Sequence, residues 1–261
     1  MIDKVIEIVR EAGNIFKDRD FKVESKGTVS NNVTTADLAV ETYLKNALLP
    51  LIDNSGFIGE ESGSSDYDNT YLWVVDPIDG TANFIRDLAF SAISVGLVND
   101  GRVVLGVVYN PYRDEMFYAE EGKGAYLNGR RISVSDRDVE HSVFCTAMSL
   151  YDKAFAKPCF NIIEKVYSEC DDIRRMGSAA LELVSLACGR VDLYFEIRVF
   201  PWDFAASEII IREAGGYIGT IELENTVFDR PIPLICANTK ENYDYLKHIV
   251  EKEIPRIPYN G

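Results

Sequence analysis

Histidine and paired cysteine are scarce in this chain of 261 residues. Only His141 and His248 are present, and the five cysteines form no CxxC pair, so zinc sites and histidine-based catalytic triads lack the residues that they need. An odd number of cysteines without paired spacing is typical of free thiols in a reducing compartment. We therefore expect a cytoplasmic protein.

Long apolar runs are absent as well. No stretch of about 18 apolar residues occurs, and the chain begins with an amphipathic helical pattern rather than an apolar leader. These observations argue against a membrane span and against a signal peptide.

Basic residues are outnumbered by acidic ones, with 27 Lys and Arg against 42 Asp and Glu, for a net charge of −15. Such a chain repels phosphate backbones and anionic lipids, which argues against nucleic acid and membrane surfaces as partners. The 47% hydrophobic content is sufficient for one large core or two fused halves, and it excludes a disordered chain.

The hydrophobic pattern divides the sequence into two halves, with a boundary near residues 133–142. Residues 1–137 combine helical patterns at 2–17 and 34–49, separated by a polar stretch over 25–32, with an antiparallel meander over 91–132. Residues 138–261 alternate strands with helices, which we expect near 160–169, 179–188, 204–214 and 240–252. The sequence therefore predicts an α+β half, followed by an α/β half.

Three short acidic motifs are the candidates for chemistry. They are Gly59-Glu60-Glu61-Ser62, Asp76-Pro77-Ile78-Asp79-Gly80-Thr81 and Trp202-Asp203. Each motif alone is compatible with an ordinary turn or helix cap. Together they place several carboxylates after apolar runs, and Gly80 allows a ligand to approach the backbone closely.

Carboxylates that converge need a counter-charge. Two of them about 4 Å apart repel each other by about 4 kcal/mol at an effective dielectric constant of about 20. Oxygen ligands without histidine or cysteine favour Mg²⁺, and two such ions suit displacement at a phosphoryl group. If Gly80 and Thr81 begin a helix, their amide groups would hold phosphate oxygens.

These motifs, together with Val33-Thr34-Thr35-Ala36-Asp37 and Arg212-Glu213-Ala214-Gly215-Gly216, resemble the inositol monophosphatase family. The resemblance extends from the first predicted helix to the last. It implies a layered αβαβα sandwich, the sugar-phosphatase fold. It also implies a homodimer that hydrolyses inositol 1-phosphate or a similar small sugar or polyol phosphate, through activation of water by two or three Mg²⁺ ions.

The resemblance also assigns roles to individual residues. It places the first metal at Glu60, Asp76 and the carbonyl group of Ile78, and the second at Asp76, Asp79 and Asp203. It assigns the activation of water to Thr81 and to Asp37 as the base, with Glu60 supporting a third, weaker metal position. The substrate contacts that it implies are Asp79, Gly80, Thr81, Ala179, Glu196 and Asp203. A loop lysine, Lys26, is expected near the metals.

Other substrates of the same superfamily stay open. They are fructose 1,6-bisphosphate, histidinol phosphate and the 3′-phosphate of phosphoadenosine nucleotides. A bisphosphate requires a second basic site, for which the candidates are Lys153, Arg174, Arg175 and Arg198. Arg198 stands where the family has small residues, and the four could equally be surface charges. A non-catalytic interaction role is a further alternative, because some relatives act as interaction proteins in transcription complexes.

Overall fold

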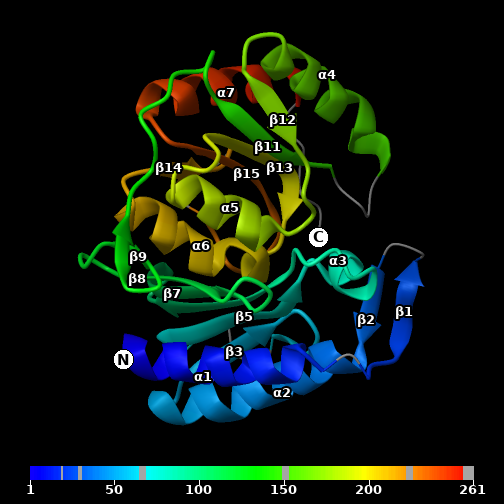
Figure 1. The fold of residues 1–261 in the computed structure, drawn as a ribbon, viewed down its shortest axis with the longest axis vertical. Helices are drawn as coiled ribbons and strands as arrows, with labels where there is room; N and C mark the ends of the chain where they lie inside the picture. The colour runs from blue at the N-terminus through cyan, green and yellow to red at the C-terminus, as the bar shows by residue number, and fades with distance from the viewer. Residues whose placement is uncertain (19, 29–30, 65–68, 149–152, 222–225, 255–261) are drawn as a thin grey trace.

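Five layers of secondary structure are stacked on one another in the computed structural model of this protein (Figure 1). The structure describes residues 1–18, 20–28, 31–64, 69–148, 153–221 and 226–254. From bottom to top in Figure 1, the layers are a helix pair, a large sheet, a second helix pair, a smaller sheet and a third helix pair. The layered αβαβα sandwich that the resemblance implies is confirmed.

The larger sheet has eight strands among the described residues, in the order β10-β9-β8-β7-β6-β5-β3-β4. Neighbouring strands pair antiparallel except for β3 and β5, which are parallel. The strands are β3 (Gly56–Gly59), β4 (Gly63–Ser64), β5 (Tyr71–Asp79), β6 (Ala92–Asn99), β7 (Arg102–Asn110), β8 (Glu115–Glu120), β9 (Ala125–Leu127) and β10 (Arg130–Ile132). The meander predicted over residues 91–132 is thus the run from β6 to β10.

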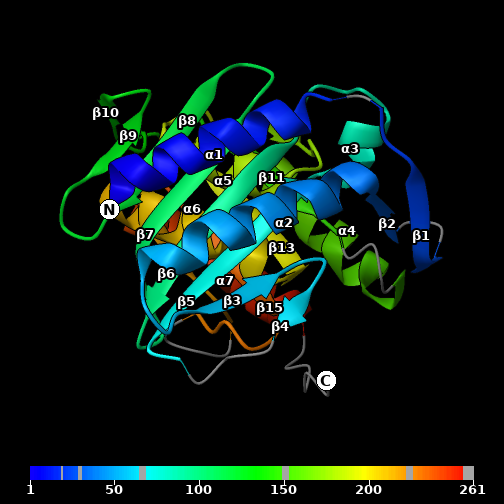
Figure 2. The same ribbon diagram turned by 90° about the horizontal axis from the view of Figure 1, so that it is seen from below.

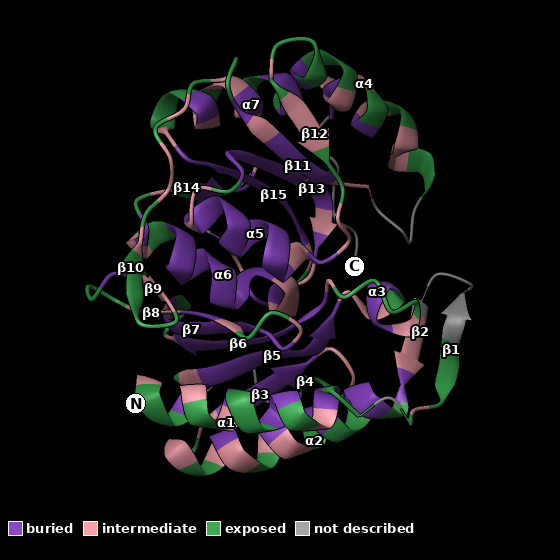
Figure 3. Ribbon diagram, in the orientation of Figure 1, coloured by how far each residue is buried: buried purple, intermediate pink, exposed green. Residues whose placement is uncertain are grey.

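One face of this sheet is covered by α1 (Ile2–Phe16) and α2 (Thr35–Leu48), which lie side by side across it (Figure 2). Val5, Val9 and Ala12 recur at helical spacing and are fully buried against the sheet, whereas the other side of each helix is exposed (Figure 3). A short 3₁₀ turn, η1 (Leu49–Leu51), follows α2. Apolar periodicity alone therefore placed these two helices correctly.

The opposite face of the large sheet carries α5 (Ala179–Ala187) and α6 (Pro201–Glu213), which form the middle layer. Both helices are buried almost all round, because a sheet lies on each side of them (Figure 3). Helix α6 lies very close to β7. A Cβ atom at Gly106 would stand 2.2 Å from the backbone oxygen of Ala206, so only glycine permits this contact. The close approach brings the first turn of α6 to the end of β5.

The smaller sheet has the strand order β12-β11-β13-β15-β14. Its strands are β11 (Val143–Ala147), β12 (Asp172–Arg174), β13 (Leu193–Val199), β14 (Tyr217–Gly219) and β15 (Ile232–Ala237). Its outer face is covered by α4 (Ala156–Tyr167), which follows the 3₁₀ turn η2 (Lys153–Phe155), and by α7 (Lys240–Glu253). That residues 1–137 and 138–261 act as two domains stays a prediction.

Two local expectations need correction. Within the polar stretch over 25–32, the described residues contribute to a hairpin of β1 (Val23–Thr28) and β2 (Asn31–Thr34), because strand pairing satisfies the hydrogen bonds of a polar backbone. Helix α6 begins at Pro201 rather than at residue 204. Across the described chain, every helix is too short or too polar to cross a lipid bilayer.

Candidate active site

Two of the predicted aspartates lie at the end of the central strand β5. Leu72, Trp73, Val74 and Val75 are buried, and they carry Asp76 and Asp79 into the interior. Residues three apart on a regular strand face opposite sides, but the pairing of β5 with β6 shifts between Asp76 and Asp79. Asp76 pairs with Ser94 and Asp79 with Ala92, so β5 carries one extra residue there. This bulge turns both carboxylates toward the same place.

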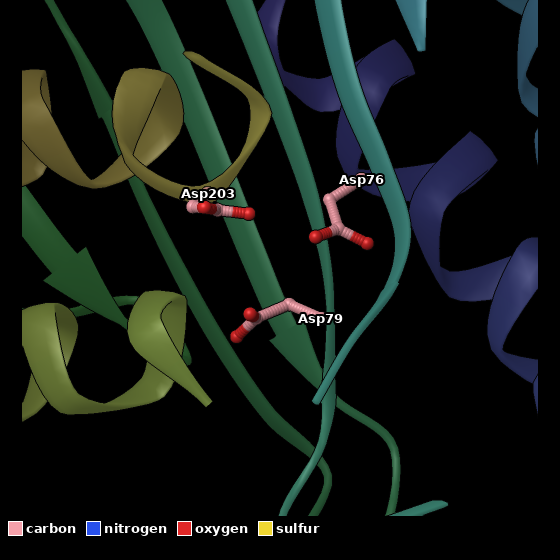
Figure 4. Close-up of side chains that lie close together, drawn as sticks. All are labelled: Asp76, Asp79 and Asp203. Carbon is pink, nitrogen blue, oxygen red and sulfur yellow. The ribbon is translucent and has the colours of Figure 1, made fainter. Parts of the chain in front are cut away.

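The third aspartate comes from the second half of the chain. Asp203 lies in the first turn of α6, where its Oδ2 accepts a hydrogen bond of 2.8 Å from the backbone N–H of Phe200. Oxygen atoms of Asp76, Asp79 and Asp203 all lie within 4.8 Å of one another (Figure 4). Tertiary packing therefore completes a three-carboxylate cluster from residues that are far apart in sequence.

A backbone N–H group fixes each of these carboxylates. Asp76 Oδ1 accepts from the N–H of Ile78 at 2.9 Å, and Asp79 Oδ2 accepts from the N–H of Ala180 at 2.9 Å. The Ser178 hydroxyl, at the N-terminus of α5, also donates to Asp79 Oδ2. Each aspartate thus uses one oxygen to hold its orientation, and its second oxygen can face a cation.

The cluster is electrostatically strained without a counter-charge. Burial raises the pKa of Asp76 well above its usual range, and the nearby carboxylates of Glu60, Asp79 and Asp203 raise it further. Burial likewise raises the pKa of Asp203, with Asp79 and Glu60 adding to the effect. The pKa of Asp79 rises to about 6 through burial, although its hydrogen bonds from Ser178 and Ala180 oppose the shift. An oxygen-only donor set with this excess negative charge fits Mg²⁺.

Two further predicted metal ligands lie beside the cluster. Glu60 lines the same cavity, but its carboxylate is not among the three whose oxygens converge within 4.8 Å. The carbonyl oxygen of Ile78, near the end of β5, accepts a hydrogen bond of 3.1 Å from the Thr81 hydroxyl across the turn at Gly80 that leads into α3 (Thr81–Ile85). Their roles as ligands stay predictions.

Asp37 and Thr81 form a hydrogen-bonded pair next to this turn. Asp37 is fully buried in the first turn of α2, where Thr34 donates to its Oδ2 from the backbone N–H at 2.7 Å and from the hydroxyl at 2.5 Å. The Thr81 hydroxyl lies 3.4 Å from Asp37 Oδ1. Thr81 lines the cavity whereas Asp37 lies behind it, so Asp37 reaches the cavity through Thr81.

A cavity of about 410 Å³ is lined by Glu60, Asp76, Asp79, Thr81 and Asp203. Gly80 adopts a left-handed conformation with φ of 86°, which starts α3 and brings the backbone of residues 80–82 to the cavity wall. Ala179 and Glu196 line the same cavity. The pKa of Glu196 rises to about 8, chiefly through burial, and its Oε2 accepts a hydrogen bond of 2.6 Å from the Tyr194 hydroxyl.

The sequence matches the inositol monophosphatase family over residues 1–254. The chain belongs to this family. It is 40% identical to Nus factor SuhB of Escherichia coli K12 over 224 residues, a match that covers 84% of each chain. It is 39% identical to inositol monophosphatase 2 of Solanum lycopersicum over 228 residues, a match that covers 83% of this chain and 86% of that protein. The solved structure of the Thermotoga maritima IMPase is similar with a TM-score of 0.84 at 32% identity, covering 96% of both chains.

The four basic residues considered for a second phosphate site lie in different parts of the fold. Arg175 and Arg198 line the cavity. Arg174 instead pairs with Asp172 and lines a different hollow, and Lys153 is exposed at η2. The side chain of Lys26 lies outside the described residues.

Sequence reasoning missed the part played by Ser178 in holding Asp79. Ser178 is also the N-cap of α5, where its hydroxyl oxygen accepts a hydrogen bond from the N–H of Leu181. Sequence reasoning also missed Glu182, which lines the cavity and accepts backbone hydrogen bonds from Met176 and Gly177. The sequence carries no signal for either contact, because both depend on how the α5 N-terminus meets β5 and its own preceding loop.

Proposed function

We propose that this protein is a Mg²⁺-dependent phosphatase that acts on inositol 1-phosphate or a similar small sugar or polyol phosphate. The observation that carries the proposal is the cluster of Asp76, Asp79 and Asp203, whose oxygens converge within 4.8 Å on the wall of a cavity. Membership of the inositol monophosphatase family supports the same reaction class.

A first Mg²⁺ would be held by Glu60, Asp76 and the carbonyl group of Ile78, and a second by Asp76, Asp79 and Asp203, with Glu60 supporting a third, weaker position. When bound, Mg²⁺ supplies Lewis-acid activation of the phosphate ester and of water, and its charge offsets the carboxylate repulsion. The backbone hydrogen bonds to the three aspartates keep their orientation before any ion arrives, so little reorganisation accompanies binding.

The protein's own contribution to proton transfer is the pair of Thr81 and Asp37. The Thr81 hydroxyl faces the cavity and lies 3.4 Å from Asp37 Oδ1, so a proton taken from water at Thr81 can pass to the carboxylate behind it. Thr34 fixes the other carboxylate oxygen, which keeps Asp37 aimed at Thr81.

Substrate would bind between the two halves of the chain. The N–H groups at the start of α3, at Gly80 and Thr81, would hold phosphate oxygens, with Asp79 and Asp203 on the metal side; both Gly80 and Thr81 line the cavity. Ala179 and Glu196 line the opposite part of the wall and would contact substrate hydroxyl groups. A cytoplasmic homodimer completes the proposal, and light scattering of the purified protein tests the dimer.

The test is phosphate release by the purified protein with Mg²⁺ and with EDTA. The panel contains inositol 1-phosphate, fructose 1,6-bisphosphate, histidinol phosphate and 3′-phosphoadenosine 5′-phosphate. We expect turnover that requires Mg²⁺ and that Asp76→Asn lowers by at least about 100-fold, the scale for loss of one stabilising group in a transition state. Turnover that EDTA and Asp76→Asn both leave unchanged would refute the metal-dependent mechanism.

A non-catalytic role is the second candidate, because the Escherichia coli relative is named Nus factor SuhB. The net charge of −15 favours a basic protein partner over direct contact with nucleic acid in such a role. Absence of turnover with every substrate, in a protein that still binds Mg²⁺, would favour this candidate over the phosphatase.

A further inference from the structure

Glu41 is a buried carboxylate that the proposed mechanism does not use. It lies in α2, one helical turn after Asp37, and the residue is 5% exposed. Within the described chain its hydrogen bonds come from backbone N–H groups, and none comes from a lysine or an arginine. Burying a carboxylate away from a cation costs free energy, so the groups that it does contact indicate its role.

Both carboxylate oxygens of Glu41 accept hydrogen bonds from the turn between β3 and β4. Oε2 accepts from the N–H of Glu61 and Oε1 from the N–H of Ser62, each at 2.9 Å. These two residues directly follow Glu60, the proposed ligand of the first metal. Hydrogen bonds to an ionised acceptor are about twice as strong as neutral ones, and a pair of them also fixes an orientation. Glu41 therefore fixes the backbone immediately after Glu60.

The backbone immediately before Glu60 is fixed by the large sheet. Gly59 pairs with Val75 of β5, and the N–H of Glu60 donates to the carbonyl oxygen of Val75 at 3.2 Å. Gly59 also leaves room for Glu41, because a Cβ atom at this position would stand 2.5 Å from the carboxylate carbon of Glu41. The sheet and Glu41 together hold the chain on both sides of Glu60.

The orientation of this turn decides where the Glu60 carboxylate points. Glu60 is partly exposed, and it lines the cavity together with Asp76. A polar turn whose backbone is not fixed samples several conformations, and restricting it to one of them costs free energy. Oxygen ligands of Mg²⁺ must lie about 2.0–2.1 Å from the ion in near-ideal octahedral geometry, so a small rotation of the turn would weaken the site. Fixing the turn beforehand therefore lowers the free-energy cost of binding the ion.

Helix α2 also carries the proposed proton acceptor. Asp37 and Glu41 are four residues apart and lie on the same face of the helix. Asp37 Oδ1 lies 3.4 Å from the Thr81 hydroxyl, while Glu41 holds the turn that follows Glu60. One helix thus supports two parts of the site that belong to different segments of the chain.

We propose that Glu41 is a positioning residue for metal binding, which aims the Glu60 carboxylate at the first metal by fixing the backbone of residues 61–62. This inference rests on the proposed function, which makes Glu60 a metal ligand. The effect of Glu41 is confined to the ions that Glu60 would hold, because separate backbone hydrogen bonds fix Asp79 and Asp203.

The experiment titrates Mg²⁺ into the metal-free protein by calorimetry, with urea unfolding in EDTA as the measure of stability. Glu41→Gln keeps one accepting oxygen but presents an NH₂ group to the second backbone N–H, so it loses one of the two hydrogen bonds. We expect the dissociation constant for Mg²⁺ to rise by about tenfold, the lower end of the range for loss of an outer partner of a ligand. The Mg²⁺ concentration that gives half-maximal phosphate release should rise by a similar factor, and saturating Mg²⁺ should restore most of kcat.

Two further variants accompany Glu41→Gln. Gly59→Ala disturbs the same contact from the opposite side, since its Cβ would displace the Glu41 carboxylate, and it should weaken Mg²⁺ binding in the same way. This variant also tests the proposal if Glu41→Gln fails to fold. Glu7→Gln, at an exposed glutamate on α1, is the matched control for the loss of one negative charge and should leave the dissociation constant unchanged.

A double variant separates positioning from a merely structural role. Because Glu41 acts through Glu60, adding Glu41→Gln to Glu60→Gln should not weaken Mg²⁺ binding further. An effect of Glu41→Gln that persists in full in the Glu60→Gln background would overturn the proposal, and so would lowered stability with an unchanged dissociation constant. Failure of the phosphatase proposal is a separate outcome, namely no turnover by the wild type, and the expected Mg²⁺ titrations would still support the positioning role.

Discussion

Replacing Asp79 by asparagine should stabilise the metal-free protein, although Asp79 is a proposed metal ligand. Burial raises the pKa of Asp79 from 3.8 to about 6, even with the hydrogen bonds from Ser178 and Ala180 that favour its charged form. The ionised side chain is therefore less stable in the folded chain than in the unfolded chain. Asparagine removes the charge and keeps an oxygen that can accept from the same two donors.

The size of this stabilisation follows from the pKa shift of Asp79. A difference of about two pKa units corresponds to about 3 kcal/mol of destabilisation at neutral pH. The weaker acceptor of asparagine costs about 1 kcal/mol, which leaves a net gain of about 2 kcal/mol in the free energy of unfolding. Because the folded-state pKa is the higher one, the destabilisation is present above about pH 6 and is lost as the pH falls toward about 4. The advantage of Asp79→Asn should disappear over the same range.

The assay is urea unfolding of the wild type and Asp79→Asn in EDTA, at about pH 7.5 and about pH 4.5, with the exposed Asp53→Asn as a control for loss of a surface charge. Mg²⁺ should reverse the order at the higher pH, since it binds the folded wild type more tightly and stabilises it by mass action. If Asp79→Asn is less stable than the wild type in EDTA at the higher pH, the hydrogen bonds outweigh the repulsion and the reasoning is wrong.

Other variants test the proton path and the packing that supports the site. Thr81→Val should lower kcat by about 100-fold or more while leaving the melting temperature nearly unchanged, and steady-state kinetics with inositol 1-phosphate measures this. Asp37→Asn should cause a comparable loss, and the double variant should be little worse than either single one, because the two groups act as one unit; additive losses would contradict the relay. Gly106→Ala should lower the free energy of unfolding by about 1–3 kcal/mol, because the new Cβ would stand 2.2 Å from the backbone oxygen of Ala206. Urea unfolding measures this change, and an unchanged stability would show that α6 can move away from β7 freely.

Much of the site could be predicted from local sequence because its parts are short and local. The bulge that aims Asp76 and Asp79 at one place lies within four residues of one strand, and Pro77 and Gly80 mark it in the sequence. The capping box of Thr34 and Asp37 is likewise formed within one turn of a helix. Long amphipathic helices such as α1 were predictable for the same reason, since one periodic face determines them.

Contacts between distant segments could not be predicted in this way. Ser178 and Asp79 are 99 residues apart and meet because α5 is held between the two sheets. The hairpin of β1 and β2 was also missed, since polar strands lack the alternating apolar pattern that identifies a half-buried strand.

By itself, the sequence determined the family, the chemistry of the ligands and the order of the elements, because motifs and hydrophobic periods are written locally along the chain. Only the tertiary structure decided which basic residues join the site. Arg174 and Arg175 are neighbours in sequence, yet Arg174 pairs with Asp172 away from the cavity while Arg175 lines it. Successive residues in an extended chain point to opposite sides, so the packing around β12 and β13, and not residue type, selects Arg175 and Arg198.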